Sequence, residues 1–227
     1  MYMIDEKSKE LISSFMHELK TPLTIVRSHL ESEIGNEELS MSLRKRLVLD
    51  VEELARLNNL LNEMNFLLNS KTQCKVEAFK KESLLSIVID LIEFLEPLAE
   101  ENQQHISLIA IQNIEIKMNK EKFQQLLLNL LTNALKYTPK KGKIHLELSE
   151  NTKEISIEVR DTGIGMNQEE ISKIFDPFYR VNKNRVSGAG LGLVIAKAIA
   201  DEHNIKISVQ SEPSKGSSFF LHIPKGS

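Results

Sequence analysis

The sequence lacks tryptophan, has one cysteine, and is poor in aromatic residues, which make up 5% of its 227 positions. The lone cysteine, Cys74, excludes an internal disulfide framework and fits a reducing compartment. With so few aromatic rings, a core has to be built mainly from Leu, Ile and Val, and the 41% hydrophobic content allows this. The length leaves room for one large domain or two modest ones.

The sequence also lacks a strong charge imbalance and a long apolar run. Its 29 basic and 32 acidic residues give a net charge of −3, so the composition does not indicate binding to nucleic acid or to a membrane surface. No apolar run approaches the roughly 18 residues of a membrane span, and no signal peptide is evident. We therefore expect a cytoplasmic chain that makes no nucleic-acid or membrane contact of its own.

What is present first is a heptad pattern in residues 1–70. In the first predicted helix, apolar residues recur at alternating steps of four and three: Ile12, Met16, Leu19, Leu23, Val26 and Leu30. The stretch "GNEELS" (35–40) predicts a turn, and a second helix then carries leucines at seven-residue steps: Leu47, Leu54, Leu61 and Leu68. This pattern predicts an antiparallel helical hairpin, which cannot cover its own apolar seam. A second copy, giving a dimeric four-helix bundle, is the favoured solution. Packing of a single hairpin on the rest of the chain is the alternative.

From about residue 75 the pattern changes to interleaved helices and strands. Helices are predicted over 82–102, 119–137 and 189–203, and "KVEAF" (75–79) is a strand candidate. Alternating apolar and polar residues predict strands over 105–110, 114–118, 143–150, 153–161, 205–212 and 217–223. Helices among mostly antiparallel strands predict an α+β sandwich with the helices covering one sheet face. We therefore expect two domains, 1–70 and 76–227, joined by a polar hinge at 71–75.

The predicted helix 119–137 carries an unusual polar stripe. Its members lie along one side of the helix: Gln125, Asn129, Asn133, Lys136 and Tyr137. Solvated helix faces usually prefer Glu and Lys, whereas Asn is a mediocre helix former. Two Asn four residues apart, followed by Lys, suit coordination of Mg²⁺ and contact with phosphate. An ordinary solvated face is the competing interpretation.

The stretch "VRDTGIGM" (159–166) ends a predicted strand at Asp161, ahead of Gly163 and Gly165. A buried Asp in this position can accept a hydrogen bond from an exocyclic amine, and the glycines let the backbone approach a flat ring. A simple glycine turn is the alternative.

A basic loop and a second glycine segment follow. Phe175 and Phe178 flank "DP", and Arg180 and Arg185 follow in a stretch with little periodicity. Apolar anchors, a spacer and cations are what a lid over phosphates needs, although a plain basic surface loop fits as well. Gly188, Gly190 and Gly192 then lead into a helix, whose N-terminal N–H groups favour an anion. A G-x-G-x-G pattern alone is a weak signal.

The ordered set "HELKTP" (17–22), "NLLTNALKY" (129–137), "DTGIGM" (161–166), "FDPFYR" (175–180) and "GAGLGL" (188–193) strongly resembles the H, N, G1, F and G2 boxes of sensor histidine kinases of two-component signalling. The resemblance covers essentially the whole chain. It implies a multidomain α+β protein: a dimerisation and phosphotransfer hairpin, then a Bergerat-type ATP-binding α/β sandwich with a mixed sheet covered by helices. It also implies a longer, membrane-anchored parent.

The resemblance implies that ATP phosphorylates His17, with Glu18 as the general base, and that the phosphoryl group then passes to an aspartate on a response-regulator receiver domain. Independently of the family, the heptad places His17 outside the apolar seam, so it is not expected to be a core residue. Thr21, one turn later, is implied in dephosphorylation of the regulator. Arg180 is implied to approach the γ-phosphate.

The resemblance also implies a site for ATP and Mg²⁺. Asn133 is the implied Mg²⁺ ligand, and Asp161 the residue that reads the adenine amine. The other implied nucleotide contacts are Asn129 and Lys136 at the phosphates, Tyr137 at the adenine, Gly163 and Gly165 beside Asp161, Phe175, Phe178 and Arg185 in the lid, and Gly188, Gly190, Leu191 and Gly192 beside the triphosphate. Two other classes stay open: an ATPase that drives clamp motion without His17, and a dimeric scaffold that has lost ATP binding.

Overall fold

The computed structural model describes residues 19–21, 23–31, 33–34, 40–69, 79–110, 113–181 and 190–225. The chain divides into two compact units, Met1–Gln73 and Cys74–Ser227, called here the N-terminal unit and the C-terminal unit. Among the described residues, no helix is both long enough and apolar enough to cross a bilayer. The predicted hinge at 71–75 lies outside the described residues.

All described residues of the N-terminal unit except Ser40 are helical. Residues 19–21, 23–31 and 33–34 are helical, and the second helix, α2, spans Met41–Asn69. Ser40 precedes α2, and its hydroxyl accepts a hydrogen bond from Leu43 N–H at 3.3 Å, as expected for a residue that caps a helix start. Several large apolar side chains of this unit are exposed, from 37% at Leu19 to 73% at Met41. None of the described side chains in this unit is buried.

The C-terminal unit contains a five-stranded mixed sheet in the order β2-β4-β5-β7-β6. Its strands are β2 (His105–Ala110), β4 (Lys143–Glu150), β5 (Glu154–Asp161), β6 (Lys206–Glu212) and β7 (Gly216–Pro224). β2 and β4 are parallel, and every other neighbouring pair is antiparallel. The predicted strands at these positions are confirmed, and so is the predicted mixed sheet.

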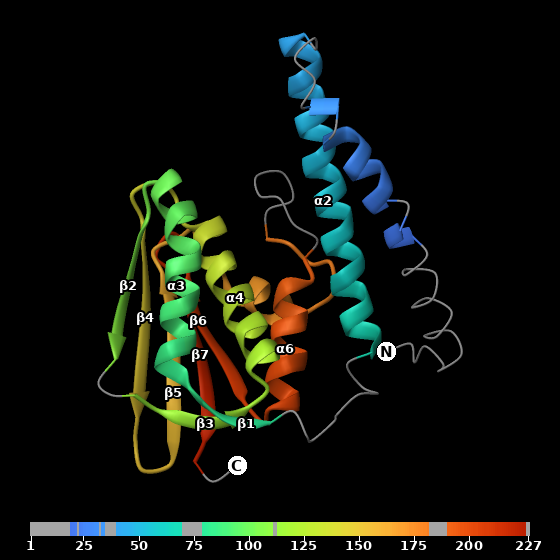
Figure 1. Ribbon diagram of the computed structural model, residues 1–227. Helices are drawn as coiled ribbons and strands as arrows, with labels where there is room; N and C mark the ends of the chain where they lie inside the picture. Colours follow the sequence, from blue (N-terminus) through green and yellow to red (C-terminus); the bar gives the residue numbers. More distant parts are fainter. Residues whose placement is uncertain are drawn as a thin grey trace. The chain divides into compact units, whose positions relative to one another are not determined.

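Three helices cover one face of this sheet: α3 (Leu84–Glu101), α4 (Lys120–Tyr137) and α6 (Gly192–Glu202) (Figure 1). The central helix, α4, has the largest share of the core, with Phe123, Leu126, Leu127 and Leu131 each fully buried. The inward side of β5 meets it with Ile157 and Val159. Side chains cap the starts of α3 and α4: Ser83 Oγ accepts from Ser86 N–H at 3.1 Å, and Asn119 Oδ1 accepts from Lys122 N–H at 3.1 Å.

The structure differs from the sequence prediction at several places. The predicted helix 82–102 begins two residues late, because β1 (Lys80–Ser83) pairs with β3 (Glu115–Met118) in a separate two-stranded sheet. The predicted strand 114–118 therefore does not join the main sheet. The short helix α5 (Gln168–Lys173) was not predicted, although Asn167 and Glu170 form a capping box at its start. Of the strand candidate "KVEAF", residues 75–78 lie outside the described part, and Phe79 is not in a strand.

Candidate nucleotide-binding site

Four segments of the C-terminal unit converge where β5 ends. They are the second half of α4, the loop after β5, residues 174–181, and the start of α6. Two close interatomic distances and one hydrogen bond show that these segments are neighbours. A Cβ built on Gly192 would lie 3.5 Å from Asn129 Oδ1, and one built on Gly163 would lie 2.6 Å from the Tyr137 carbonyl oxygen. Phe178 N–H donates to the Gly190 carbonyl at 3.1 Å.

Asn129 of α4 carries a polar group without a partner. Its Nδ2 is buried and has no hydrogen-bond partner among the described residues. Leaving a buried donor unpaired costs about 1–3 kcal/mol, so such groups in native proteins call for an explanation. Asn129 faces the first residue of α6, whose start receives no hydrogen bond from a side-chain cap. An unpaired amide beside uncapped backbone N–H groups is an arrangement that suits an anionic oxygen ligand.

Asp161, the last residue of β5, is a nearly buried carboxylate with 6% exposure. Its Oδ1 accepts hydrogen bonds from Gly163 N–H at 2.7 Å and from Ser217 N–H at 3.3 Å. Burial raises the pKa of this carboxyl above its usual value, and the two backbone donors partly oppose the shift. Neither of these two bonds uses the other carboxylate oxygen of Asp161.

The loop after β5 is held tightly against the end of α4. Ile164 N–H donates to the Tyr137 carbonyl at 3.2 Å. A Cβ on Gly163 would lie 2.6 Å from Asp161 Oδ1 as well as from that carbonyl, so the close approach requires glycine. Gly165 is buried, with a φ of 64°. The predicted glycines Gly163 and Gly165 thus lie in the loop that holds the Asp161 carboxylate in place.

Ser217 and Ser211 are site residues that the sequence analysis missed. Ser217, on β7, supplies the second donor to Asp161. Ser211 Oγ, on β6, accepts from Met166 N–H at 2.8 Å, donates to the Gly216 carbonyl at 2.9 Å and lies 3.0 Å from Ser217 Oγ. These bonds tie the loop after β5 to two other strands. β6, β7 and the loop after β5 are close only because of the strand order of the sheet. The sequence pattern therefore gave no signal for Ser211 and Ser217.

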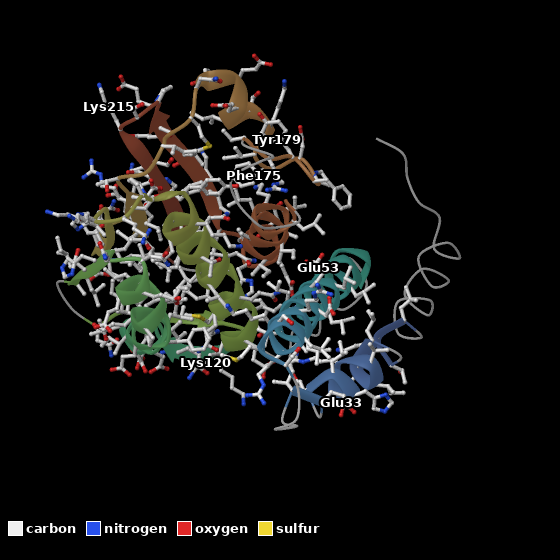
Figure 2. All side chains as sticks on the ribbon, turned by 90° about the horizontal axis from the view of Figure 1, so that it is seen from above. Glu33, Glu53, Lys120, Phe175, Tyr179 and Lys215 are labelled. Carbon is white, nitrogen blue, oxygen red and sulfur yellow. The ribbon has the colours of Figure 1, made fainter. Side chains whose placement is uncertain are left out.

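Residues 174–181 form the base of the predicted lid. Phe178 has a φ of 65°, and its side chain is 59% exposed, whereas Phe175 is half-buried. Figure 2 shows Phe175 close to Tyr179 in this segment. At the other end of the lid, Gly190 has a φ of 75°, and a Cβ there would lie 2.7 Å from the Tyr179 carbonyl oxygen. The hydrogen bond from Phe178 to Gly190 therefore holds residues 174–181 beside the start of α6.

Two further predicted residues lie near each other at this end of the unit. Tyr137 is half-buried, and burial raises the pKa of its hydroxyl, while the positive charge of Arg180 acts in the opposite direction. Arg180 is thus within electrostatic reach of the end of α4.

The other predicted residues differ in exposure. Lys136 is exposed, Asn133 is half-buried, and Leu191 is 1% exposed. Arg185 and Gly188 lie outside the described residues.

The predicted phosphotransfer residues belong to the N-terminal unit. Thr21 lies in a helical stretch and is exposed. His17 and Glu18 lie outside the described residues, so their roles stay predictions. The roles of the residues in the C-terminal unit also stay predictions, although the structure brings Asn129, Tyr137, Asp161, Gly163, Arg180, Gly190 and Gly192 into one region.

Residues 118–227 match the family described as histidine kinase-, DNA gyrase B-, and HSP90-like ATPase. Similar curated proteins include the sensor histidine kinase WalK of Bacillus subtilis, 32% identical over 97% of this chain and 37% of that protein. The phosphate regulon sensor protein PhoR of Pseudomonas aeruginosa is 28% identical over 98% of this chain and 51% of that protein. The chain thus spans about half the length, or less, of these relatives.

Solved structures give the same picture of the fold. The nucleotide-free catalytic domain of histidine kinase ThkA has a TM-score of 0.59 at 26% identity, covering 65% of this chain and 95% of that one. Full-length ShkA in complex with AMPPNP has a TM-score of 0.82 at 24% identity, covering 95% of this chain and 45% of that one. The arrangement of a helical N-terminal part and a mixed sheet covered by helices is therefore shared with known proteins.

Proposed function

This chain belongs to the sensor histidine kinases and carries their catalytic core, and from that premise we propose that it binds ATP in its C-terminal unit and transfers the γ-phosphoryl group to His17. The observation that carries the proposal is the buried, unpaired Nδ2 of Asn129 beside the uncapped start of α6. It supports a bound group with anionic oxygen atoms, which a triphosphate supplies.

Asp161 supports recognition of the base. Because Oδ1 is occupied by two backbone donors, the second oxygen is oriented to accept a hydrogen bond from the exocyclic amine of adenine. A guanine ring carries a carbonyl oxygen in place of that amine, so it would present an acceptor to an acceptor. The proposed site therefore selects ATP over GTP.

Asn133 and Arg180 support neutralisation of the phosphate charge. Asn133 lies one helical turn from Asn129 on α4 and is half-buried, so the carbonyl oxygen of its side chain fits a Mg²⁺ ligand. Mg²⁺, when bound, neutralises phosphate charge and draws the phosphate oxygens into a fixed geometry. Arg180, within reach of Tyr137, adds a second positive charge from the base of the lid.

In the proposed reaction, a ring nitrogen of His17 bonds to the γ-phosphorus as the bond from that phosphorus to the leaving oxygen of ADP breaks. Glu18 accepts the proton from the other ring nitrogen, which strengthens the nucleophile as its charge develops. The phosphoryl group then passes to an aspartate on the receiver domain of a response regulator. The exposed apolar side chains of the N-terminal unit support a homodimer, and the exposed hydroxyl of Thr21 supports a phosphatase reaction on the regulator. A cytoplasmic location within a longer, membrane-anchored parent is part of the same proposal.

The test is incubation with γ-labelled ATP and Mg²⁺, followed by detection of alkali-stable, acid-labile phosphate on the protein. Wild type and His29→Gln should be labelled, because His29 is an exposed histidine of the N-terminal unit with no proposed role. His17→Gln should bind ATP by calorimetry without becoming labelled, and Asn133→Ala should lose labelling through weaker binding of Mg²⁺ and ATP. Release of free phosphate without labelling would favour the clamp-type ATPase, and absence of nucleotide binding would favour the scaffold.

A further inference from the structure

The second face of the main sheet carries a serine, a histidine and a glutamate in hydrogen-bonded sequence. Ser208 Oγ lies 2.8 Å from His222 Nε2, and His222 Nδ1 lies 3.1 Å from Glu154 Oε1. Since Glu154 can only accept from Nδ1–H, Nε2 is the ring nitrogen that accepts from the serine hydroxyl. The side chains of His222 and Glu154 are 28% and 38% exposed, so solution reagents can reach them.

Strand order and register explain why three distant positions meet. β7 lies between β5 and β6, so His222 has neighbours on both sides. On β7, Phe220 and Pro224 are the neighbours of His222 that point to the same face of the sheet. Ser208 of β6 is paired with Phe220, and Glu154 of β5 is paired with Pro224. The three side chains therefore run diagonally across β6, β7 and β5, on the face that no described helix covers (Figure 1).

The same sheet face contains a natural comparison. Ser107 Oγ lies 2.5 Å from His145 Nδ1, on the neighbouring strands β2 and β4. Among the described residues, no carboxylate is hydrogen-bonded to the His145 ring. The molecule thus holds one Ser–His pair with an orienting carboxylate and one without.

We propose that Ser208 is a nucleophile that accepts acyl groups from small activated esters and related acyl donors, with His222 as its general base and Glu154 as the residue that orients the ring. Nucleophile, base and orienting group within hydrogen-bond reach are the arrangement by which enzymes activate a serine hydroxyl. The inference is independent of ATP binding and of His17.

In the reaction, Ser208 Oγ bonds to the carbonyl carbon, and the bond from that carbon to the leaving oxygen breaks. The hydroxyl proton passes to His222 Nε2 and from there to the leaving group. The product is an ester on Ser208, which water hydrolyses in a slower step. Because the cluster lies on a sheet face, it suits donors with a good leaving group over peptides or alkyl esters. Lys206 stands directly opposite His222 and is exposed, so its ammonium favours anionic acyl donors.

The test uses the full chain and p-nitrophenyl acetate as the probe, with acetylated peptides identified by mass spectrometry over time. The wild-type protein should acetylate at Ser208 much faster than at Ser107, the serine of the pair without a carboxylate. His222→Gln should slow acetylation of Ser208 by about 10²-fold, the lower end of the usual contribution of a general base, and Glu154→Gln should slow it less. His145→Gln is the matched control and should leave the rate at Ser208 unchanged.

Circular dichroism and urea unfolding of each variant separate a loss of acetylation from a loss of folding. Equal acetylation of Ser208 and Ser107, or an unchanged rate at Ser208 in a folded His222→Gln protein, would overturn the proposal. The hydrogen bonds would then serve only to tie β5, β6 and β7 together. Neither outcome depends on phosphorylation, so failure here and failure of the kinase proposal are distinguishable.

Discussion

The two units of this chain are stabilised in different ways. The C-terminal unit buries an apolar core between one sheet face and three helices, with side chains such as Phe123, Leu131 and Ile157 fully enclosed. In the N-terminal unit no described side chain is buried, and apolar residues such as Ile25 and Leu49 are more than half exposed.

This difference indicates a division of labour, in which the C-terminal unit holds the nucleotide site and the N-terminal unit forms the dimer. A unit with its own core can hold a nucleotide site in fixed geometry, because the site residues stand on packed elements. A helical unit whose described side chains all stay partly exposed gains its stability from a partner surface, since most helical stability in proteins comes from packing of an apolar face. We therefore expect the C-terminal unit to bind ATP by itself and the N-terminal unit to depend on a second copy.

The largest effect is expected from a cavity in the core of the C-terminal unit. Leu131 is fully buried on α4, so Leu131→Ala should lower the free energy of unfolding of that unit by about 2–5 kcal/mol. Leu49→Ala, on a residue 62% exposed in the N-terminal unit, should change the stability of the isolated subunit by less than about 0.5 kcal/mol. Urea unfolding followed by circular dichroism measures both, and similar losses from the two variants would contradict the contrast between the units.

The next effect concerns the buried carboxylate that is proposed to read adenine. Asp161→Asn should weaken ATP binding by about 1.5–3 kcal/mol, the contribution of a hydrogen bond to a charged group, or about 10- to 100-fold. Isothermal calorimetry measures this. Asp90→Asn, on an exposed carboxylate of α3, is the control and should bind as wild type does.

The same Asp161 variant gives a stability prediction with a defined sign. Because burial raises the pKa of Asp161, the folded state favours the protonated form, and its stabilising contribution is lost as pH rises through the folded pKa. At neutral pH the ionised carboxylate therefore weakens the fold, so Asp161→Asn should be as stable as wild type or more stable. The difference should shrink toward acid pH, below the ordinary pKa of Asp. A variant that loses stability most strongly at neutral pH would contradict this sign.

A change in the apolar seam should separate subunits without unfolding the C-terminal unit. Val26 lies in the predicted seam and is 46% exposed in the single chain. Val26→Glu should weaken the free energy of dimerisation by about 1.5–3 kcal/mol for each Val26 side chain that the dimer buries. Sedimentation would detect this loss as dissociation. Ile25 is the matched control, since it is 51% exposed but outside the seam, and Ile25→Glu should leave the dimer intact. Equal dissociation by both variants would count against the heptad interface.

The smallest effect on kinase activity is expected at Thr21. Thr21→Ala should keep autophosphorylation and lose dephosphorylation of the phosphorylated regulator, because the exposed hydroxyl is proposed to position water on the regulator. Thr24→Ala is the control, since Thr24 Oγ1 donates to the Lys20 carbonyl of its own helix. Decay of labelled regulator measures the phosphatase reaction. Equal loss of both activities in Thr21→Ala would point to a structural role.

Periodic patterns predicted most of the fold in the C-terminal unit. Strict alternation at Ile155, Ile157 and Val159 predicted β5, and the broad apolar face of 119–137 predicted α4 with its ends nearly correct. The start of α3 was wrong because a local helical preference was overridden by pairing of Lys80–Ser83 with a strand far along the chain. Helix α5 was missed although its capping box was present in the sequence.

The site was only partly accessible from sequence. Asp161, Gly163 and the Asn residues of α4 stand in motifs, so their side chains could be singled out. Ser211 and Ser217 hold the loop after β5 and Asp161 through hydrogen bonds that depend on which strands are neighbours. The Ser208–His222–Glu154 cluster depends on register in the same way. Such contacts between distant segments have no local sequence signal.

The most direct test of the division of labour asks which unit carries the phosphate. Cys74, the single cysteine, is the first residue of the C-terminal unit, so cyanylation and cleavage at this residue separate the two units. The cleavage runs at alkaline pH, where phosphohistidine is stable. After incubation of the full chain with γ-labelled ATP and Mg²⁺, the account predicts label on residues 1–73 alone, within the peptide that contains His17. Label on the fragment 74–227, or on the N-terminal fragment of His17→Gln, would contradict it.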